Sequence, residues 1–488
     1  MTPSLALIAI LAAPLVQAVL VLVLSRPPGL RDVTHIAGAL VTAGLAIYLA
    51  NAVANGETAR IVLARPLPNV DLAFSIEPLG ALMAGVVAVL GVPHAAYTAG
   101  IVRATHQKAP ARMMAFMALS TAAAMAVAFS ANLFSFFVAY QALALASFPI
   151  VAHGGDEDAR RAARIYLATL LAAAIGVFMP AMVWTYAVAG ALDFQPGGVL
   201  AGRVDPLTAN VLLVLFVFGL AMTAIPPVHR WLPAASAAPF PAMVTIHALA
   251  VLPAGGVGLL KVVAFVFGSA LNDAVWAAHA LLVLVGVGMC ASALIALSKQ
   301  DMRERLAYSC MAQSLAVVMG ALLALPAGLF AAALQIVAMA CAGATLLMAA
   351  GAVYAATGRT NASDYAGLGR IMPWTFAGFA IGSASMIGMP PFAGAWAKLW
   401  LITAAAGAGL HWAAALAGLA AILTFAHLGP LAAQALAGRA PADAFKRPDG
   451  APILLVAPIV LSAAATLWLL AAADPLANFL SPIWTPAP

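Results

Sequence analysis

Residues 225–231 read Ile-Pro-Pro-Val-His-Arg-Trp, and residues 389–396 read Met-Pro-Pro-Phe-Ala-Gly-Ala-Trp. Each stretch interrupts a long apolar run, one in each half of the chain. Proline lacks an amide hydrogen and clashes with the preceding turn, so each Pro-Pro pair breaks a helix. Carbonyls freed at membrane depth are tolerated only against protein or a wet cavity. A matched pair of interrupted segments indicates a transport protein built from structural repeats, with two unrelated proline kinks as the alternative. The broken-helix prolines are Pro226, Pro227, Pro390 and Pro391.

The composition places the whole chain in a membrane. Of 488 residues, 65% are hydrophobic and 8% are charged, whereas a soluble domain carries about 25% charged residues. The apolar runs are too long for barrel strands and fit membrane helices. The three cysteines, Cys290, Cys310 and Cys341, lie in apolar stretches without CxxC spacing. We therefore predict an all-α polytopic membrane protein without a disulfide framework, a metal site or an iron–sulfur cluster.

Hydropathy predicts 14 membrane helices. Their ranges are 4–25, 34–54, 77–101, 113–130, 133–152, 164–189, 207–227, 241–268, 274–297, 305–325, 328–356, 373–404, 411–437 and 451–473. The first run has no preceding basic residue and no clear cleavage site, so we interpret it as a retained span. Range 373–404 is long for one span, and its Pro-Pro pair marks a break within it.

Basic residues alternate strongly between successive loops. The loops after odd-numbered helices hold 17 of them, and the loops after even-numbered helices hold three. The first group is Arg26, Arg31, Arg103, Lys108, Arg112, Arg160, Arg161, Arg164, Arg230, Lys299, Arg303, Arg305, Arg359, Arg370, Arg439, Lys446 and Arg447; the second is Arg60, Arg65 and Arg203. The positive-inside rule then predicts a multi-pass protein of a bacterial-type inner (plasma) membrane, with both termini non-cytoplasmic. It also explains the net charge of +6 without a nucleic-acid partner.

Several motifs occur in the order found in one family. The segments are 132–137, 227–233 followed by 238–241, 301–309, 367–373 and 388–398. They resemble the opening of the family's fifth helix and its PxHxWLPxA…APTP, DxKRxLAYSS, GLGRxMP and GxPPxxGFxxK patterns. The chain thus resembles the antiporter-like, proton-conducting membrane subunits of respiratory complex I, Mrp-type Na⁺/H⁺ antiporters and energy-converting hydrogenases. The resemblance covers roughly residues 130 to 400.

The resemblance implies a particular organisation. Family members have 14 helices and two inverted five-helix repeats, each with a broken helix. Transferred to this sequence, residues 1–110 hold helices 1–3, residues 111–270 the first repeat, residues 271–437 the second repeat, and residues 438–488 the last helix and tail.

Three basic residues are candidate proton-relay sites. An ionisable group within a membrane span costs about 2.5–3.5 kcal/mol on insertion scales, so each is a functional hypothesis. Lys398 matches the family's lysine in the second broken helix, and the alternative is a lysine that reaches the membrane interface. His247 resembles the histidine of a PxSALIHA segment, with a structural core histidine as the alternative. Lys261 is either a central station or a group near a helix end. None of the 16 carboxylates is predicted in mid-span; Glu77 lies at a span end. Four lone histidines are interpreted as structural: His94, His279, His411 and His427.

Two departures from the family concern the first repeat. Gln141 stands where the fifth helix of family members carries its key glutamate, and Met222 stands where the first broken helix carries a lysine. In the eleventh helix, Met339 and Gly343 replace the usual histidine and lysine. Neither Gln141 nor Met222 titrates. The chain is therefore identified as a charge-depleted member whose relay lies mainly in the second repeat.

Three functions stay open at this point. The first is a membrane subunit of a multi-subunit proton or Na⁺ translocating complex of the NADH-quinone oxidoreductase, Mrp or hydrogenase type. The second is a non-conducting structural subunit of such a complex, and the third is an independent solute transporter. The chain has no GxGxxG after a strand and no cysteine cluster, so redox chemistry would belong to partner subunits. We expect no cofactor and no metal, and we expect other membrane subunits and the lipid bilayer as partners. Whether the assembly is an enzyme stays open.

Overall fold

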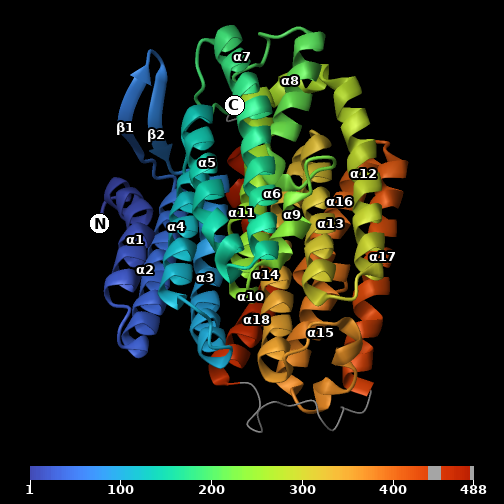
Figure 1. Cartoon of the computed structure of the whole chain (residues 1–488). Helices are drawn as coiled ribbons and strands as arrows, with labels where there is room; N and C mark the ends of the chain where they lie inside the picture. The colour runs from blue at the N-terminus through green and yellow to red at the C-terminus, as the bar shows by residue number, and fades with distance from the viewer. Residues whose placement is uncertain (438–451, 484–488) are drawn as a thin grey trace.

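The computed structural model describes residues 1–437 and 452–483, and it is almost entirely helical (Figure 1). The N-terminal part contains α1 (Pro3–Val23), α2 (Pro28–Ala54), β1 (Arg60–Leu67), β2 (Val70–Ser75) and α3 (Pro78–Ala104). Thr2 and Glu77 cap α1 and α3 by accepting backbone N–H bonds with their side chains. The first amides of a helix have no acceptor within the helix, so such caps and a proline in the first turn favour a helix start at these positions.

The middle of the chain folds around the first Pro-Pro pair. Its elements are α4 (Pro110–Ala128), α5 (Leu133–Val151), α6 (Glu157–Ala173), the π-helical turn η2 (Ala174–Phe178), α7 (Met179–Ala189), α8 (Pro206–Gly219), the 3₁₀ turn η3 (Ala221–Thr223), α9 (Trp231–Ala234), α10 (Phe240–Val244), the π-helical turn η5 (Thr245–Leu249), α11 (Val251–Lys261) and the π-helical turn η6 (Val262–Phe267). The segment from α10 to η6 is continuous and buried throughout.

The remaining helices surround the second Pro-Pro pair. They are α12 (Val275–Ser298), α13 (Met302–Leu322), α14 (Pro326–Thr357), α15 (Pro373–Ile387), α16 (Ala393–Gly407), α17 (His411–Ala437) and α18 (Ile453–Leu480). The short 3₁₀ turns are η1 (Ala152–Gly154), η4 (Ala235–Ala237), η7 (Gly268–Asp273), η8 (Ala362–Tyr365), η9 (Leu368–Arg370) and η10 (Ser481–Ile483). Helix α14 lies at the centre of the bundle, where it packs on α13, α15, α16 and α18.

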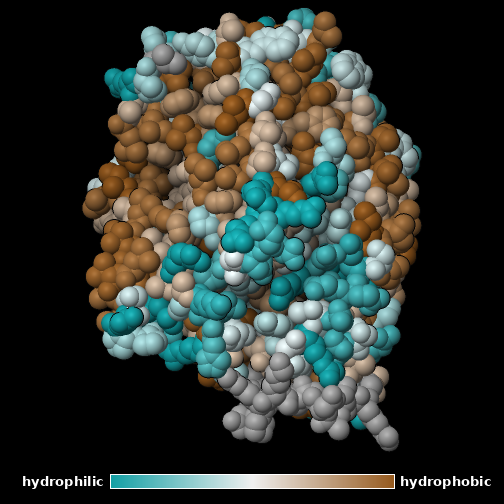
Figure 2. Space-filling model, in the orientation of Figure 1, coloured by the Kyte–Doolittle hydropathy of each residue, from teal (hydrophilic) through white to brown (hydrophobic). Residues whose placement is uncertain are grey.

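The surface fits a lipid environment. Figure 2 shows apolar side chains over both flanks of the bundle, with polar side chains gathered in the lower centre and at the lower end. Large apolar residues are exposed on the outer helices, among them Val19 at 59%, Ile47 at 59% and Ile422 at 65%. A soluble monomer rarely exposes such extended apolar surface, so these faces contact lipid or other membrane subunits.

The helix count differs in a simple way from the 14 expected spans. In the described residues, 11 helices are long and apolar enough to cross a membrane, and a twelfth is added if the bent C-terminal pair is one span. The two expected ranges outside this count, 207–227 and 373–404, contain the Pro-Pro pairs. The structure divides them into the shorter helices α8, α15 and α16. Residue 451, the first of the last expected range, lies outside the described residues, as do the loop residues Arg439, Lys446 and Arg447.

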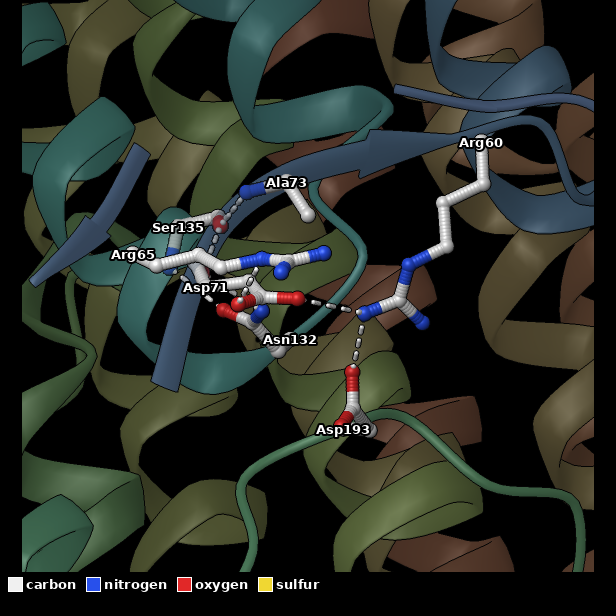
Figure 3. Close-up of polar contacts among 7 residues, drawn as sticks. All are labelled: Arg60, Arg65, Asp71, Ala73, Asn132, Ser135 and Asp193. Atoms are coloured by element: carbon white, nitrogen blue, oxygen red, sulfur yellow. Dashed lines mark hydrogen bonds and ion pairs between the residues drawn. The ribbon is translucent and has the colours of Figure 1, made fainter. Parts of the chain in front are cut away.

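A two-stranded hairpin between α2 and α3 was not expected from the sequence. Strands β1 and β2 pair antiparallel, and polar contacts hold them on the start of α5 (Figure 3). Asn132 Nδ2 donates to the Asp71 carbonyl at 2.8 Å, and the Ala73 amide donates to Ser135 Oγ at 2.8 Å. Arg60 lies 2.8 Å from the Asp193 carboxylate and 3.6 Å from that of Asp71. These bonds connect the N-terminal part to the middle of the chain.

Candidate ion-translocation site

The two breaks share one backbone arrangement. In each, a residue with positive φ stands two positions before the Pro-Pro pair: Ala224 at +55° and Gly388 at +95°. Both Pro-Pro peptide bonds are cis. Both ranges are therefore interrupted at the predicted prolines, by the same local geometry.

At the first break, neutral side chains bind the freed backbone groups. The Met222 amide donates to Tyr140 Oη at 2.8 Å, and Trp231 Nε1 donates to the Ala221 carbonyl at 2.7 Å. Ser314 Oγ donates to the Thr223 carbonyl at 2.8 Å. Met222 itself is fully buried. Unpaired backbone groups would be costly here, so these three bonds explain how the break is tolerated without charge.

Gln141 lies one residue beyond Tyr140 on α5. Its Oε1 is buried and has no hydrogen-bond partner among the described residues. The two family positions predicted to have lost their charges thus hold an unpaired amide oxygen and a buried thioether. Neither exchanges protons at physiological pH.

The second break carries Lys398, which is 7% exposed. Its Nζ donates to the Met386 carbonyl near the end of α15. The lysine stem packs against Gly388, where an added Cβ would lie 2.6 Å from Lys398 Cδ. Glycine at 388 therefore provides both the positive φ and the space that the lysine occupies. No carboxylate lies within ion-pair distance of Lys398 in the described part of the chain.

A buried histidine lies on α17, which packs on α16, the helix of Lys398. His427 is 1% exposed. Its Nδ1 lies 3.0 Å from the Leu423 carbonyl, so the ring proton is on Nδ1 and Nε2 accepts from Ser309 Oγ at 3.2 Å. Sequence reasoning interpreted His427 as structural. The apolar residues around it in the sequence gave no signal of its contact with Ser309.

His247 lies on the π-helical turn η5 and is fully buried. Its Nδ1 is 3.1 Å from the Met243 carbonyl and its Nε2 is 3.2 Å from the Leu232 carbonyl. A neutral imidazole carries one N–H, so one of these contacts lacks a hydrogen, whereas the protonated ring donates to both. The environment thus offers two acceptors to a proton-carrying ring.

Lys261 lies at the ends of helices rather than beside the breaks. Its Nζ donates to the Ala128 carbonyl at 2.7 Å and to the Ser130 carbonyl at 3.1 Å, directly after α4. It also lies 3.2 Å from Glu77 Oε1, at the start of α3, and 5.2 Å from the centre of the Phe194 ring. Glu77 is a partner of Lys261 that sequence reasoning missed.

The region between His247 and Lys398 is neutral. Gly343 on α14 faces Ala248, Cys310 and Met386: an added Cβ would lie 3.4, 3.5 and 3.8 Å from their side chains, respectively. Elsewhere on α13 and α14, Gln335 Nε2 donates to Gln313 Oε1 at 3.0 Å. Polar groups are therefore present where α13 packs on α14.

The second helix begins earlier than expected, which places an acid inside it. Helix α2 begins at Pro28, earlier than the expected residue 34, so Asp32 lies within its first turns and is 3% exposed. Arg31 and Arg103 lie 2.7 and 2.6 Å from its carboxylate. Proline is favoured at the first position of a helix, so α2 begins at Pro28. The Asp32 carboxylate is therefore within the helix, buried, and paired with two arginines.

Comparison with known proteins agrees with the fold. The family described as NADH:quinone oxidoreductase/Mrp antiporter, TM, matches residues 130–424. The chain is 27% identical over 405 residues to NADH-quinone oxidoreductase subunit N of Desulforudis audaxviator, covering 81% of this chain and 79% of that protein. It is 27% identical over 280 residues to a Na⁺/H⁺ antiporter protein of Alkalihalophilus pseudofirmus, covering 56% of this chain and 55% of that protein.

Other relatives are matched over a smaller share of their length. NADH-quinone oxidoreductase subunit L of Mycobacterium tuberculosis is 30% identical over 319 residues, and the chain spans 48% of it. Similarly, the chain spans about half of the NAD(P)H-quinone oxidoreductase chain 5 of a Picosynechococcus species, at 51%.

Two solved structures share the fold over nearly the whole chain. One is the Mrp complex of a Dietzia species, with a TM-score of 0.85, 24% identity, and coverage of 100% of this chain and 98% of that one. The other is the membrane-bound sulfane sulfur reductase, an archaeal respiratory membrane complex, with a TM-score of 0.85, 23% identity and coverage of 97% and 96%. The expected resemblance is confirmed: this chain belongs to the NADH:quinone oxidoreductase/Mrp antiporter transmembrane family.

Proposed function

We propose that this chain is a membrane subunit of a multi-subunit complex that translocates protons or Na⁺, of the NADH-quinone oxidoreductase, Mrp or hydrogenase type. Its relatives are named as subunits of such assemblies. The observation that carries the proposal is Lys398, a buried lysine at the second break whose ammonium group donates to the Met386 carbonyl. Burial of an ammonium group without a carboxylate favours release of its proton, which a relay requires.

In this proposal, protons pass mainly through the second repeat. At the first break, Tyr140, Trp231 and Ser314 satisfy the backbone with neutral groups. A proton relay needs exchangeable sites at each step, and Gln141 and Met222, at the family's charged positions, carry no titratable group. We propose His247 as the station that lies between the two halves, because its two carbonyl neighbours both accept bonds from a protonated ring.

Lys261 has a different proposed role from Lys398. Glu77, two carbonyls and an aromatic ring surround its ammonium group. We propose that it exchanges protons with Glu77 at the end of the bundle rather than at its centre. The carboxylate of Glu77 is 20% exposed, which leaves it in reach of water.

We further propose the repeat organisation and the orientation. Residues 111–270 and 271–437 form the two inverted repeats, which the matching backbone at Ala224 and Gly388 supports. The distribution of basic residues between loops supports termini on the non-cytoplasmic side. A single cysteine introduced at Thr2 and labelled with a membrane-impermeant maleimide in intact cells tests this orientation. Labelling only after permeabilisation would reverse it.

Membership of a complex is tested by gentle detergent extraction of the tagged protein, followed by mass spectrometry of what remains bound. Stoichiometric redox or antiporter subunits are the expected result. Isolation of the chain alone would contradict the proposal and would favour the independent solute transporter. If partners are found, a Lys398→Ala complex with unchanged cation flux would instead favour the structural subunit.

A further inference from the structure

A small polar chamber lies between the N-terminal helices and the turn that carries His247. It is a cavity of about 30 Å³, lined by residues of α1, α2, α3, α4 and the helical turn that runs from η5 into α11. A cavity needs roughly 10–15 Å³ on this measure to hold one water molecule, so one or two fit. Its polar lining residues are Gln17, His35, Thr42, His94, Thr121 and Thr245. Such a lining favours water over an empty apolar void.

The hydrogen bonds of His35 fix its tautomer. Gln17 Nε2 lies 2.8 Å from the His35 carbonyl and 3.1 Å from His35 Nδ1. The carbonyl only accepts, so the amide group facing it is the NH₂, which then also donates to Nδ1. The ring proton of neutral His35 is therefore on Nε2. This Nε2 is buried and has no hydrogen-bond partner among the described residues, so it is a free donor.

His94 shows the complementary arrangement. Its Nε2 lies 2.9 Å from the Pro241 carbonyl, which only accepts, so the ring proton is on Nε2. The acceptor nitrogen of the neutral ring is then Nδ1. His35 and His94 both line the chamber. Two residues that line one chamber thus have, as neutral rings, a donor nitrogen on His35 and an acceptor nitrogen on His94.

The chamber also touches the proposed relay. Thr245 Oγ1 bonds the same Pro241 carbonyl at 3.3 Å, and it lies two residues before His247 on η5. On its other side, His35 follows Asp32 by one turn of α2. The charged or titratable groups near His35 are Arg31 and Asp32 on its own helix, and Arg103 and His94 on α3.

We propose that this chamber binds one or two water molecules and is a proton-accepting side site, in which His35 orients the water and His94 takes the proton. A hydronium ion in the chamber gives its proton to Nδ1 of neutral His94, which forms an N–H bond and leaves neutral water behind. The imidazolium keeps its Nε2–H bond to Pro241. The assignment of this proton to the translocation path rests on the proposed function; the bound water and the tautomers do not.

The chamber can be filled without disturbing its neighbours. Gly91 lies on the same face of α3 as Val87, Ala88, His94 and Ala95, which all line the chamber, and an added Cβ at Gly91 meets no heavy atom within 4 Å. Gly91→Val should therefore occupy the water positions. Gly85→Val is the matched control, because Gly85 is on the same helix with equally open space but does not line the chamber.

Hydroxyl-radical labelling of the purified native complex by millisecond X-ray pulses tests for the water. Met117 lines the chamber and is 3% exposed, whereas Met125, on the same helix, is fully buried elsewhere. We expect Met117 to be labelled several-fold faster than Met125, and this difference to disappear in Gly91→Val but not in Gly85→Val. Equal labelling of the two methionines in the wild type would overturn the proposal. Labelling does not require flux, so a non-conducting protein gives the same readout.

Nitrogen NMR of histidine-labelled protein tests the proton site. Signals are assigned by their loss in His35→Gln and His94→Gln. We expect both neutral rings to carry the proton on Nε2 and to exchange magnetisation with water, and His94 Nδ1 to become protonated as the pH falls. An Nδ1–H tautomer of His94, or no water contact in the wild type, would contradict the inference. Gly91→Ala provides a milder filling variant if Gly91→Val does not fold.

Discussion

Lys261 and Glu77 form an ion pair, with 3.2 Å between Nζ and Oε1, across 184 positions of sequence. The lysine side chain is fully buried, and that of the glutamate is 20% exposed. Two carbonyls at the end of α4 complete the bonds of the ammonium group. The pair thus connects the start of α3 to the end of α11, and it makes the packing of the N-terminal helices dependent on charge.

Removing one member of this pair should destabilise the protein more than removing both. Glu77→Gln leaves a buried ammonium group with carbonyls alone, and breaking a buried pair in this way costs about 3 kcal/mol. The double variant Glu77→Gln, Lys261→Met removes the charge as well. We expect its thermal midpoint in detergent to recover most of the loss. A double variant as unstable as the sum of the single ones would show that the two residues are not coupled.

Tyr140→Phe should weaken the first break. The substitution removes the acceptor of the Met222 amide and leaves that buried N–H without a partner. The expected cost is about 1–3 kcal/mol, because desolvation of the amide is no longer compensated. Thermal stability in detergent measures it. Tyr48→Phe is a control on an outer helix; an equal effect of both variants would argue against a specific role of Tyr140.

A lysine introduced at the first break should destabilise the protein unless a carboxylate is introduced with it. Met222→Lys places an ammonium group at a fully buried position, at a cost of about 2.5–3.5 kcal/mol on insertion scales. Gln141→Glu in the same chain would provide a carboxylate. We expect the double variant to be more stable than Met222→Lys, as measured by its thermal midpoint. A double variant no more stable than the single one would contradict the assignment of these residues to the family's charged positions.

Replacing the His247 ring with an apolar side chain should lower cation translocation. His247→Leu leaves the Met243 and Leu232 carbonyls without its ring, and it removes a proton-exchanging group from η5. We expect cation translocation by the reconstituted complex to fall at least tenfold. His279→Leu is the matched control, because His279 is on the exposed part of α12. Retention of full flux by His247→Leu would remove His247 from the relay.

Local features of the fold were predictable from the sequence, but contacts between residues far apart in the sequence were not. The breaks at the Pro-Pro pairs follow from proline chemistry alone, so both were found, and so was Lys398 beside the second break. The hairpin at residues 60–75 was missed because its short strands give a weak periodic signal beside long apolar helices. Glu77 and His427 acquire their significance only through partners more than 100 residues away, at Lys261 and Ser309. Hydropathy does not report such contacts.

The measurement that tests the account most directly is proton or Na⁺ uptake into vesicles of the reconstituted native complex, with Lys398 exchanged. Lys398→Ala removes the site, and Lys398→Arg keeps a positive charge that does not deprotonate in proteins. Lys299→Ala is the control: Lys299 follows the end of α12, and its hydrogen bond to Glu304 raises the pKa of its ammonium group. We predict that Ala and Arg at 398 both reduce the initial uptake rate at least tenfold, whereas Lys299→Ala leaves it unchanged. Wild-type uptake in Lys398→Ala would contradict conduction through the second repeat and leave a structural subunit.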